Sequence, residues 1–307
     1  MKTKIQKYLI VIAGPTAVGK TKVAIEIAKY FDTDIISADS RQIFRELNIG
    51  VARPSEEELN TVKHYFIANK SIDEYVSAGT YECEVLELLN TLYQKKDIVV
   101  LCGGTGFYTN AVLNGFDEMP KVNPEIRSEL NAIFRNEGIV PLQEKLKILD
   151  IDSYNTLDIM NPQRVIRALE ICIGTGKKYS DFKTKKSIER NFMPIKIGLD
   201  LPKEILHKNI NNRVDKMMEE GFLDEAKSVY EHKKNNALQT VGYKELFDFL
   251  DHRTSMEEAV ELIKLHTRQY AKRQMTFFKK DKEIQWFAPN EIDNMLQFIN
   301  IKRLEYF

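Results

Sequence analysis

Three short runs of apolar residues stand out in the first third of the chain, at 8–13, 34–38 and 97–102. Gly, Ser or Thr follows each run within a few residues, and a helical pattern comes next. Short continuous apolar runs of this kind are typical of strands buried in a parallel sheet. Strands alternating with helices predict a doubly wound α/β fold, in which ligands bind beyond the carboxyl ends of the strands.

From about Pro120 the pattern becomes helical. Asn-Pro pairs at 123–124 and 161–162 each place an N-cap residue before a proline in the first turn. The apolar stripes that follow predict two helices, ending at Gly138 and Gly174.

The chain then returns to the core. The polar, basic segment 175–190 is typical of an exposed connector, 194–201 of a strand, and Pro202 opens a helix that Gly221 stops. We therefore expect an α/β core interrupted by a helical insertion, with the first part of the core over 1–118, the insertion over 119–198, and the completed core with its C-terminal helices over 199–307.

A complete phosphate-loop pattern, G-x-x-x-x-G-K-[ST], lies between the first strand and the first helix. Its backbone amides and helix N-terminus would bind phosphate oxygens, its lysine would add a positive charge, and its last hydroxyl could bind Mg²⁺. This pattern predicts a P-loop NTPase-like parallel sheet core that binds a polyphosphate. The residues are Gly14, Pro15, Thr16, Ala17, Val18, Gly19, Lys20 and Thr21.

The loop pattern does not specify which reaction the bound phosphate undergoes. The strand at 97–102 runs directly into Gly103 and Gly104, whereas a motor ATPase or GTPase usually has an Asp there for Mg²⁺. Residues 69–73 only approximate a guanine-reading motif, with Asp73 one position late. Small-molecule kinases therefore remain, as do enzymes that use the loop to hold a diphosphate leaving group.

Asp39 follows the second apolar run and should lie beside the phosphate loop. A carboxylate there can accept a proton from an attacking nucleophile, and a general base contributes about 10²–10⁴ in rate. The alternative is that Asp39 or Ser40 only caps the following turn.

Composition limits the partners. The 307 residues include 45 basic and 45 acidic side chains, and the net charge of zero excludes indiscriminate binding of polyanions. Basic residues nevertheless concentrate at 177–190 and 264–282, where a local basic face could serve one folded RNA. Three scattered cysteines indicate a reducing compartment, and His and Cys show no zinc spacing. Without a convincing signal peptide or apolar span, we expect a soluble, cytoplasmic protein that binds no membrane.

Seven motifs in consistent order together resemble the tRNA dimethylallyltransferase family, over about residues 8–290. They are the phosphate loop, Asp39-Ser40-Arg41-Gln42, Gly50-Val51-Ala52-Arg53-Pro54, the segment from Gly103 to Tyr108, the segment from Asn161 to Glu170, Val241-Gly242-Tyr243-Lys244-Glu245, and the segment from Arg268 to Gln274.

The resemblance implies transfer of a dimethylallyl group from dimethylallyl diphosphate to the exocyclic amine of adenine 37 of tRNA, beside the anticodon. Stabilising charge on the departing diphosphate would fall to the phosphate loop and Mg²⁺. By this resemblance Asp39 is the general base, Thr16 assists near the reacting centre, Arg213 is a second cation on the diphosphate, and Thr21 is the Mg²⁺ ligand.

The acceptor would be the anticodon stem-loop, with its target base flipped out of the stack. Arg164 and Arg167 share a helix face that suits phosphate contact, although exposed ion pairs would explain them equally well. On a helix at 255–278, the basic stripe of Lys264, Arg268 and Lys272 is a further candidate for RNA contact. The resemblance assigns tRNA contacts to Asp39, Ser40, Arg41, Gln42, Thr105, Arg127, Gln163, Arg164, Val165, Ile166, Arg167, Thr240, Val241, Gly242, Tyr243, Lys244 and Glu245.

Four positions depart from the usual family residues: Phe44, Val51, Arg53 and Phe277. They bear on substrate selection rather than on the reaction class. The alternatives left open are a prenyltransferase for free adenine nucleotides, a P-loop kinase for a small molecule and a non-catalytic RNA-binding module. We expect a monomer.

Overall fold

The computed structural model describes residues 6–117, 119–183 and 188–305. It divides into two compact units: the core, Met1–Asn114 with Glu189–Phe307, and the insertion, Gly115–Ile188. No helix in the described ranges is both long enough and apolar enough to cross a membrane.

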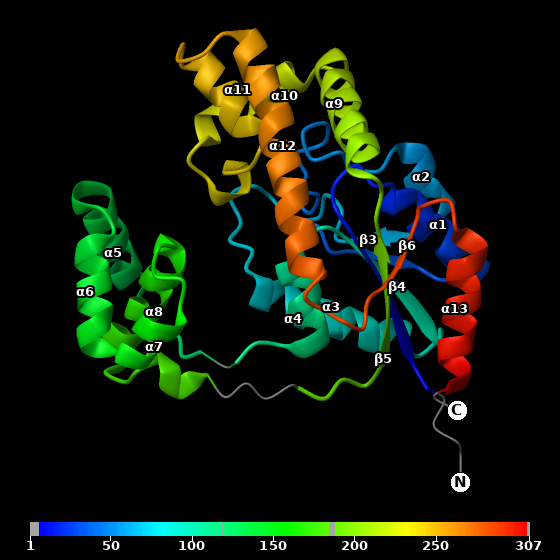
Figure 1. Cartoon of the computed structure of the whole chain (residues 1–307), viewed down its shortest axis with the longest axis horizontal. Helices are drawn as coiled ribbons and strands as arrows, with labels where there is room; N and C mark the ends of the chain where they lie inside the picture. Colours follow the sequence, from blue (N-terminus) through cyan, green and yellow to red (C-terminus); the bar gives the residue numbers. More distant parts are fainter. Residues whose placement is uncertain (1–5, 118, 184–187, 306–307) are drawn as a thin grey trace. The chain divides into compact units, whose positions relative to one another are not determined.

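A parallel sheet forms the centre of the core (Figure 1). Within the described residues it has six strands in the order β3-β2-β4-β1-β5-β6, which confirms the predicted α/β class. β1 lies in the middle, with Tyr8 opposite Ile98 on one side and Met193 on the other. The strands are β1 (Tyr8–Ala13), β2 (Ile35–Ser37), β3 (His64–Tyr65), β4 (Ile98–Cys102), β5 (Met193–Leu199) and β6 (Gln285–Phe287).

Three of the four inner strands, β1, β2 and β4, are the ones that the three apolar runs predict, and the fourth, β5, corresponds to the strand predicted at 194–201. β1 and β4 are buried along almost their whole length, because a parallel strand covered on both faces contacts no water. The edge strands β3 and β6 have two and three residues and are only partly buried, so no apolar run marks them in the sequence.

Helices cover both faces of the sheet. α1 (Lys20–Tyr30) and α13 (Ile292–Glu305) lie on one side, and α3 (Ala78–Leu92) and α4 (Gly106–Asn114) on the other (Figure 1). α1 packs through Val23, Ala24 and Ile27, which are fully or almost fully buried, and α13 packs through Met295 and Ile299.

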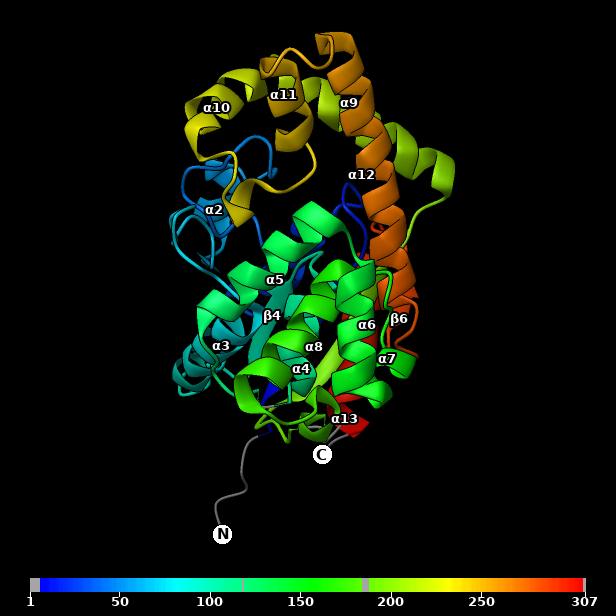
Figure 2. The same cartoon turned by 90° about the vertical axis from the view of Figure 1, so that its left-hand side faces the viewer.

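A further group of helices lies beyond the carboxyl ends of the strands, where α9 and α12 cross (Figure 2). The predicted helices at 202–221 and 255–278 are confirmed as α9 and α12, and a capping box at Ser255 starts α12. The members of this group are α9 (Lys203–Glu219), α10 (Phe222–Ser228), α11 (Tyr243–Leu250) and α12 (Met256–Phe278). A separate short helix of the core, α2, spans Glu56–Thr61.

The insertion is a helical unit with its own apolar core around Leu130, Leu142 and Leu169. Its helices are α5 (Pro124–Glu137), α6 (Val140–Leu149), α7 (Ile151–Thr156) and α8 (Pro162–Thr175). The caps predicted at Asn123 and Asn161 are both present.

The predicted end of α8 at Gly174 is wrong. The helix continues to Thr175, and Gly176 ends it with a left-handed φ of 68°. Gly174 is needed for packing instead, because a Cβ there would lie 2.4 Å from the Val122 side chain.

The segment predicted as an exposed connector, 175–190, is partly folded. Ser180 donates two hydrogen bonds to the buried carboxylate of Asp150, within the insertion. Arg190 belongs to the core, where its side chain is only 10% exposed and pairs with Glu82 at 2.6 Å, so its assignment to an exposed segment was wrong. Residues 184–187 lie outside the described residues.

Candidate active site

The phosphate loop joins β1 to α1, as its sequence pattern predicts. Gly19 has φ 101°, a left-handed conformation that side chains disfavour, and α1 starts directly after it. The amides at the start of α1 therefore point into the loop, which suits an anion. Lys20 folds back over the loop and donates to the Pro15 carbonyl at 2.6 Å.

Two cations meet at this loop. The pKa of Lys20 is lowered to about 8, chiefly by burial and also by the nearby Arg213 guanidinium, while Cys102 and Asp39 oppose the shift. Burial also lowers the pKa of Arg213, whose Nη1 donates to Thr16 Oγ1 at 3.2 Å. An enclosed pair of like charges is costly without an anion, so this end of the site is suited to a diphosphate.

Asp39 stands just past the end of β2, at the same edge of the sheet. Its Oδ1 accepts from the amides of Arg41 at 2.8 Å and Gln42 at 3.3 Å. The capping interpretation of Asp39 is therefore present in the structure. Since these bonds fall on one oxygen of the carboxylate, they do not conflict with proton acceptance by the other.

Two adjoining cavities surround these groups. One, of about 360 Å³, is lined by Lys20, Thr21 and Gln274 among others. The second, of about 440 Å³, extends to Gly50 and the segment 239–244. Thr16, Asp39 and Arg213 line both, together with Val51 and Tyr270. We call the two together the reactive cavity.

Gln274 on α12 is a residue whose role the sequence does not reveal. It accepts from the Thr16 amide at 2.8 Å and donates to the Gly104 carbonyl at 2.8 Å. A buried amide that satisfies both partners holds the phosphate loop and the turn after β4 in one arrangement. In the sequence, Gln274 was marked only by its position at the end of the family-like segment from Arg268 to Gln274.

Tyr270, one turn earlier on α12, faces the same cavity. Burial, with the charge of Asp39, raises the pKa of its hydroxyl to about 12. The phenol therefore stays protonated at neutral pH and can act as a hydrogen-bond donor.

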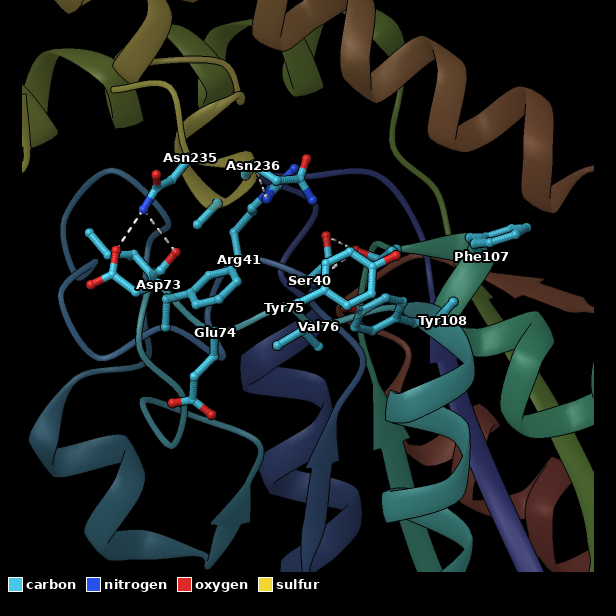
Figure 3. A pocket seen from close by; sticks show the side chains of 15 residues that line it. Ser40, Arg41, Asp73, Glu74, Tyr75, Val76, Phe107, Tyr108, Asn235 and Asn236 are labelled. Carbon is cyan, nitrogen blue, oxygen red and sulfur yellow. Dashed lines mark hydrogen bonds between the residues drawn. The ribbon is translucent and has the colours of Figure 1, made fainter. Parts of the chain in front are cut away.

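A third cavity, of about 460 Å³, shares Arg41 with the reactive cavity, and Figure 3 shows the residues that line it. Ser40 and Arg41 line it as well as the reactive cavity. Arg41 crosses to the Asn236 carbonyl at 2.8 Å, and the Ser40 amide donates to Thr105 Oγ1 at 3.0 Å. Tyr75, at the rim, is 81% exposed. We call this cavity the side pocket.

The predicted tRNA-contact segment 240–245 borders the reactive cavity, but only some of its residues face the cavity. Thr240, Val241, Gly242 and Lys244 line the cavity. The side chains of Tyr243 and Glu245 are buried, and they bind Glu225 and His266 respectively. These two hold the segment in place from behind.

The predicted contacts in the insertion form a separate group. Arg127 donates to Glu170 at 2.9 Å and to Gln163 at 3.0 Å, and Arg167 pairs with the same Glu170 carboxylate at 3.1 Å. Arg164 lies exposed on the same helix. Val165 and Ile166 are fully buried in the core of the insertion, so the face open to a partner consists of the polar members.

Two residues of the basic stripe on α12, Lys264 and Arg268, bind other residues of the core. Lys264 binds Asp215 at 2.8 Å and Glu261 at 3.0 Å. Arg268 donates to Asn211 at 2.7 Å. Two carboxylates compensate the charge of Lys264, so this residue attracts phosphate less strongly than its sequence position indicates, whereas Arg268 binds a neutral amide.

The described residues contain no group of three or more His, Cys, Asp or Glu that could hold a metal ion alone. Thr21 and Asp39 line one cavity with Glu58, so oxygen donors for a hard cation are present there.

A family model described as IPP transferase matches residues 42–281. The chain is 46% identical to a tRNA dimethylallyltransferase of Cytophaga hutchinsonii, over 98% of this chain and 99% of that protein. It is 49% identical to one of Flavobacterium johnsoniae, over 92% and 93%. Among solved structures, a tRNA isopentenylpyrophosphate transferase from Bacillus halodurans matches with TM-score 0.73 and 35% identity, covering 98% of each chain. A eukaryotic dimethylallyltransferase acting on tRNA matches with TM-score 0.76 and 26% identity, covering 94% of this chain and 75% of that one.

Proposed function

This chain belongs to the IPP transferase family, and from that premise we propose that it transfers a dimethylallyl group from dimethylallyl diphosphate to the exocyclic amine of adenine 37 in the anticodon loop of tRNA. Its curated relatives are tRNA dimethylallyltransferases, which makes it a prenyl-transferring enzyme rather than a kinase. The observation that carries the finer proposal is the reactive cavity, where two partly buried cations and a carboxylate face one space.

The leaving group belongs at the phosphate loop. There the loop amides, Lys20 and Arg213 stabilise negative charge as the allylic carbon–oxygen bond breaks. The buried setting strengthens these interactions, because little water screens them. Mg²⁺ fits beside Thr21, since it commonly binds through one or two protein oxygens and substrate phosphates. When bound it would neutralise charge on the diphosphate.

The acceptor amine belongs at Asp39. The amine loses a proton as its bond to carbon forms, and the carboxylate receives that proton. Thr16 lies between the two ends, held by Arg213 and Gln274, so it borders the reacting centre.

A tRNA acceptor is better supported than a free nucleotide. The side pocket adjoins Asp39 through Ser40 and Arg41 and presents the exposed ring of Tyr75. Bases of an unpaired RNA loop stack on such rings, whereas free AMP would leave the side pocket and the arginine face of the insertion without a role. We further propose that the enzyme is cytoplasmic, because its three cysteines are free thiols, as is usual in a reducing compartment. We also propose that it is a monomer, which size-exclusion chromatography tests.

One assay tests the function. The protein is incubated with labelled dimethylallyl diphosphate, Mg²⁺ and either an anticodon stem-loop carrying adenine 37 or AMP. We expect label in the stem-loop alone, and none when adenine 37 is replaced by guanine. Label in AMP but not in the stem-loop would overturn the proposal.

A further inference from the structure

Glu225, on α10, makes an unusual set of contacts for a carboxylate that lies outside the proposed chemistry. Its Oε2 accepts from the amides of Asn48 at 3.0 Å and Ile49 at 2.7 Å, and its Oε1 from the amide of Gly50 at 2.9 Å. Tyr243 adds its hydroxyl to Oε1 at 2.5 Å. Four donors thus converge on one half-buried anion, and three come from consecutive residues of a loop about 175 positions away.

The same loop is held from its other side by a cation. Arg53 Nη2 donates to the carbonyls of Phe44 and Arg45, each at 3.0 Å, and also to that of Leu47. A carboxylate therefore binds the loop amides while a guanidinium binds its carbonyls. Hydrogen bonds to charged groups are the stronger kind, so the loop has one well-determined path although it lacks helix or strand structure.

Close packing against two aromatic rings also fixes the position of the loop. A Cβ on Gly50 would lie 2.2 Å from the Phe222 ring and 2.8 Å from the Tyr243 ring, so only glycine fits between the loop and these rings. The loop is thereby pressed against α10 and α11. Gly50, with the next two residues, forms one wall of the reactive cavity.

The loop also connects to Asp39. Gln42 Nε2 donates to the Val51 carbonyl at 3.3 Å and the Ala52 carbonyl at 2.9 Å, and the Gln42 amide donates to Asp39 Oδ1. We propose that Glu225 is a positioning residue for the acceptor end of the site: it fixes the loop 48–52, and through Gln42 it fixes the Asp39 carboxylate. This inference rests on the proposed function.

Two isosteric variants on adjacent residues of α10 give the test. Glu225→Gln keeps the shape but removes the charge and leaves the nitrogen of the new amide facing donors. Asp224→Asn is the matched control, because the Asp224 side chain is 81% exposed and, among the described residues, pairs with Lys227 three residues on. Single-turnover prenylation of the stem-loop at saturating dimethylallyl diphosphate is compared with the affinity for inorganic pyrophosphate and Mg²⁺.

For Glu225→Gln we expect the single-turnover rate to fall about 10- to 100-fold, as for loss of charged hydrogen bonds. Pyrophosphate affinity should stay within about twofold, because the hydrogen bonds that Glu225 and Gln42 form within the described part of the chain do not involve the phosphate loop. Asp224→Asn should match wild type in both. Equal rates for the two variants would overturn the inference, whereas a wild-type protein that prenylates no stem-loop would overturn the proposed function instead.

A double-mutant cycle separates positioning from a general loss of stability. If Glu225 acts through Gln42, Glu225→Gln should slow the reaction by less than about threefold in a Gln42→Ala background, because coupled residues are not additive. Additive effects would contradict the inference. Tyr243→Phe, which removes one donor and keeps the carboxylate, supplies a milder variant if Glu225→Gln does not fold; its rate should fall about 3- to 10-fold, and a wild-type rate would count against the inference.

Discussion

In the proposed function, the core and the insertion would both direct basic side chains at a polyanionic group, but they place these charges differently. In the core, Lys20 and Arg213 are enclosed, and burial lowers the pKa of each. In the insertion, the side chains of Arg127 and Arg167 are 39% and 38% exposed and share the carboxylate of Glu170.

The difference teaches what each set can recognise. Enclosed charges act over a short range with little screening, which suits one small diphosphate in a fixed position. Exposed charges are screened by salt within a Debye length of about 8–10 Å, which suits a reversible grip on an RNA backbone. Changes in the core should therefore alter chemistry and diphosphate binding, and changes in the insertion should alter the salt dependence of RNA binding.

The largest effect should come from Asp39. Both Asp39→Ala and Asp39→Asn should lower the single-turnover rate by about 10²–10⁴, with RNA affinity nearly unchanged. The Asn variant keeps an oxygen for the Arg41 and Gln42 amides, so it separates the base from the cap. A near-normal rate for Asp39→Asn would reduce Asp39 to a capping residue.

Lys20 should come next. Lys20→Ala should raise the KM for dimethylallyl diphosphate about 10- to 100-fold, since a charged hydrogen-bond donor is lost, and should leave RNA affinity unchanged.

The lowered pKa of Lys20 also gives a pH dependence. Because the pKa in the free protein is about 8, Lys20 is protonated below pH 8 and loses its proton above it. We therefore expect diphosphate affinity to weaken as the pH rises through about 8, measured by titration with inorganic pyrophosphate and Mg²⁺. The same fall in Lys20→Arg, whose charge persists, would assign the titration to another group.

In the insertion, Arg164→Ala with Arg167→Ala should weaken stem-loop binding and lower the magnitude of its salt slope by up to ~2. The KM for dimethylallyl diphosphate should not change. Arg135→Ala with Lys145→Ala removes the same charge from other exposed positions of the insertion and should keep the wild-type slope. Equal slopes for both pairs would mean that the insertion acts through its overall charge rather than through the α8 face.

Tyr75→Ala in the side pocket should have the smallest effect, raising the KM for the stem-loop roughly fivefold, at the low end for loss of one stacked base. Tyr75→Trp should keep the ring face and the affinity. Tyr30→Ala, at an exposed tyrosine on α1, serves as the control. An unchanged KM for Tyr75→Ala would remove the side pocket from the RNA footprint.

The sequence predicts those structural features that are determined by residues close together in the chain. The phosphate loop, the inner strands and the capped helices depend on neighbouring residues, and their positions are confirmed. The edge strands β3 and β6 are too short to form a pattern. The end of α8 was misplaced because a glycine that permits close packing resembles one that ends a helix.

The site divides in the same way. Asp39, Lys20 and Arg213 could be selected from motif and resemblance, and they line one cavity. Glu225 and Gln274 could not be assigned roles, because they act on backbone groups of distant segments, and backbone groups leave no residue pattern. Which residues of α8 face outward also became clear only from the structure. Arg164 lies on the surface, whereas Val165 and Ile166, next to it, are buried.

The strand order has a consequence for synthesis of the chain. β1 pairs with β4 on one side and with β5 on the other, yet residues 115–188 separate these two neighbours in the sequence. A chain emerging from the ribosome thus carries one open apolar edge on β1 until β5 is made, and such an edge favours aggregation. Because the insertion buries an apolar core of its own, it can fold during that interval, which shortens the span that must close before the sheet is complete.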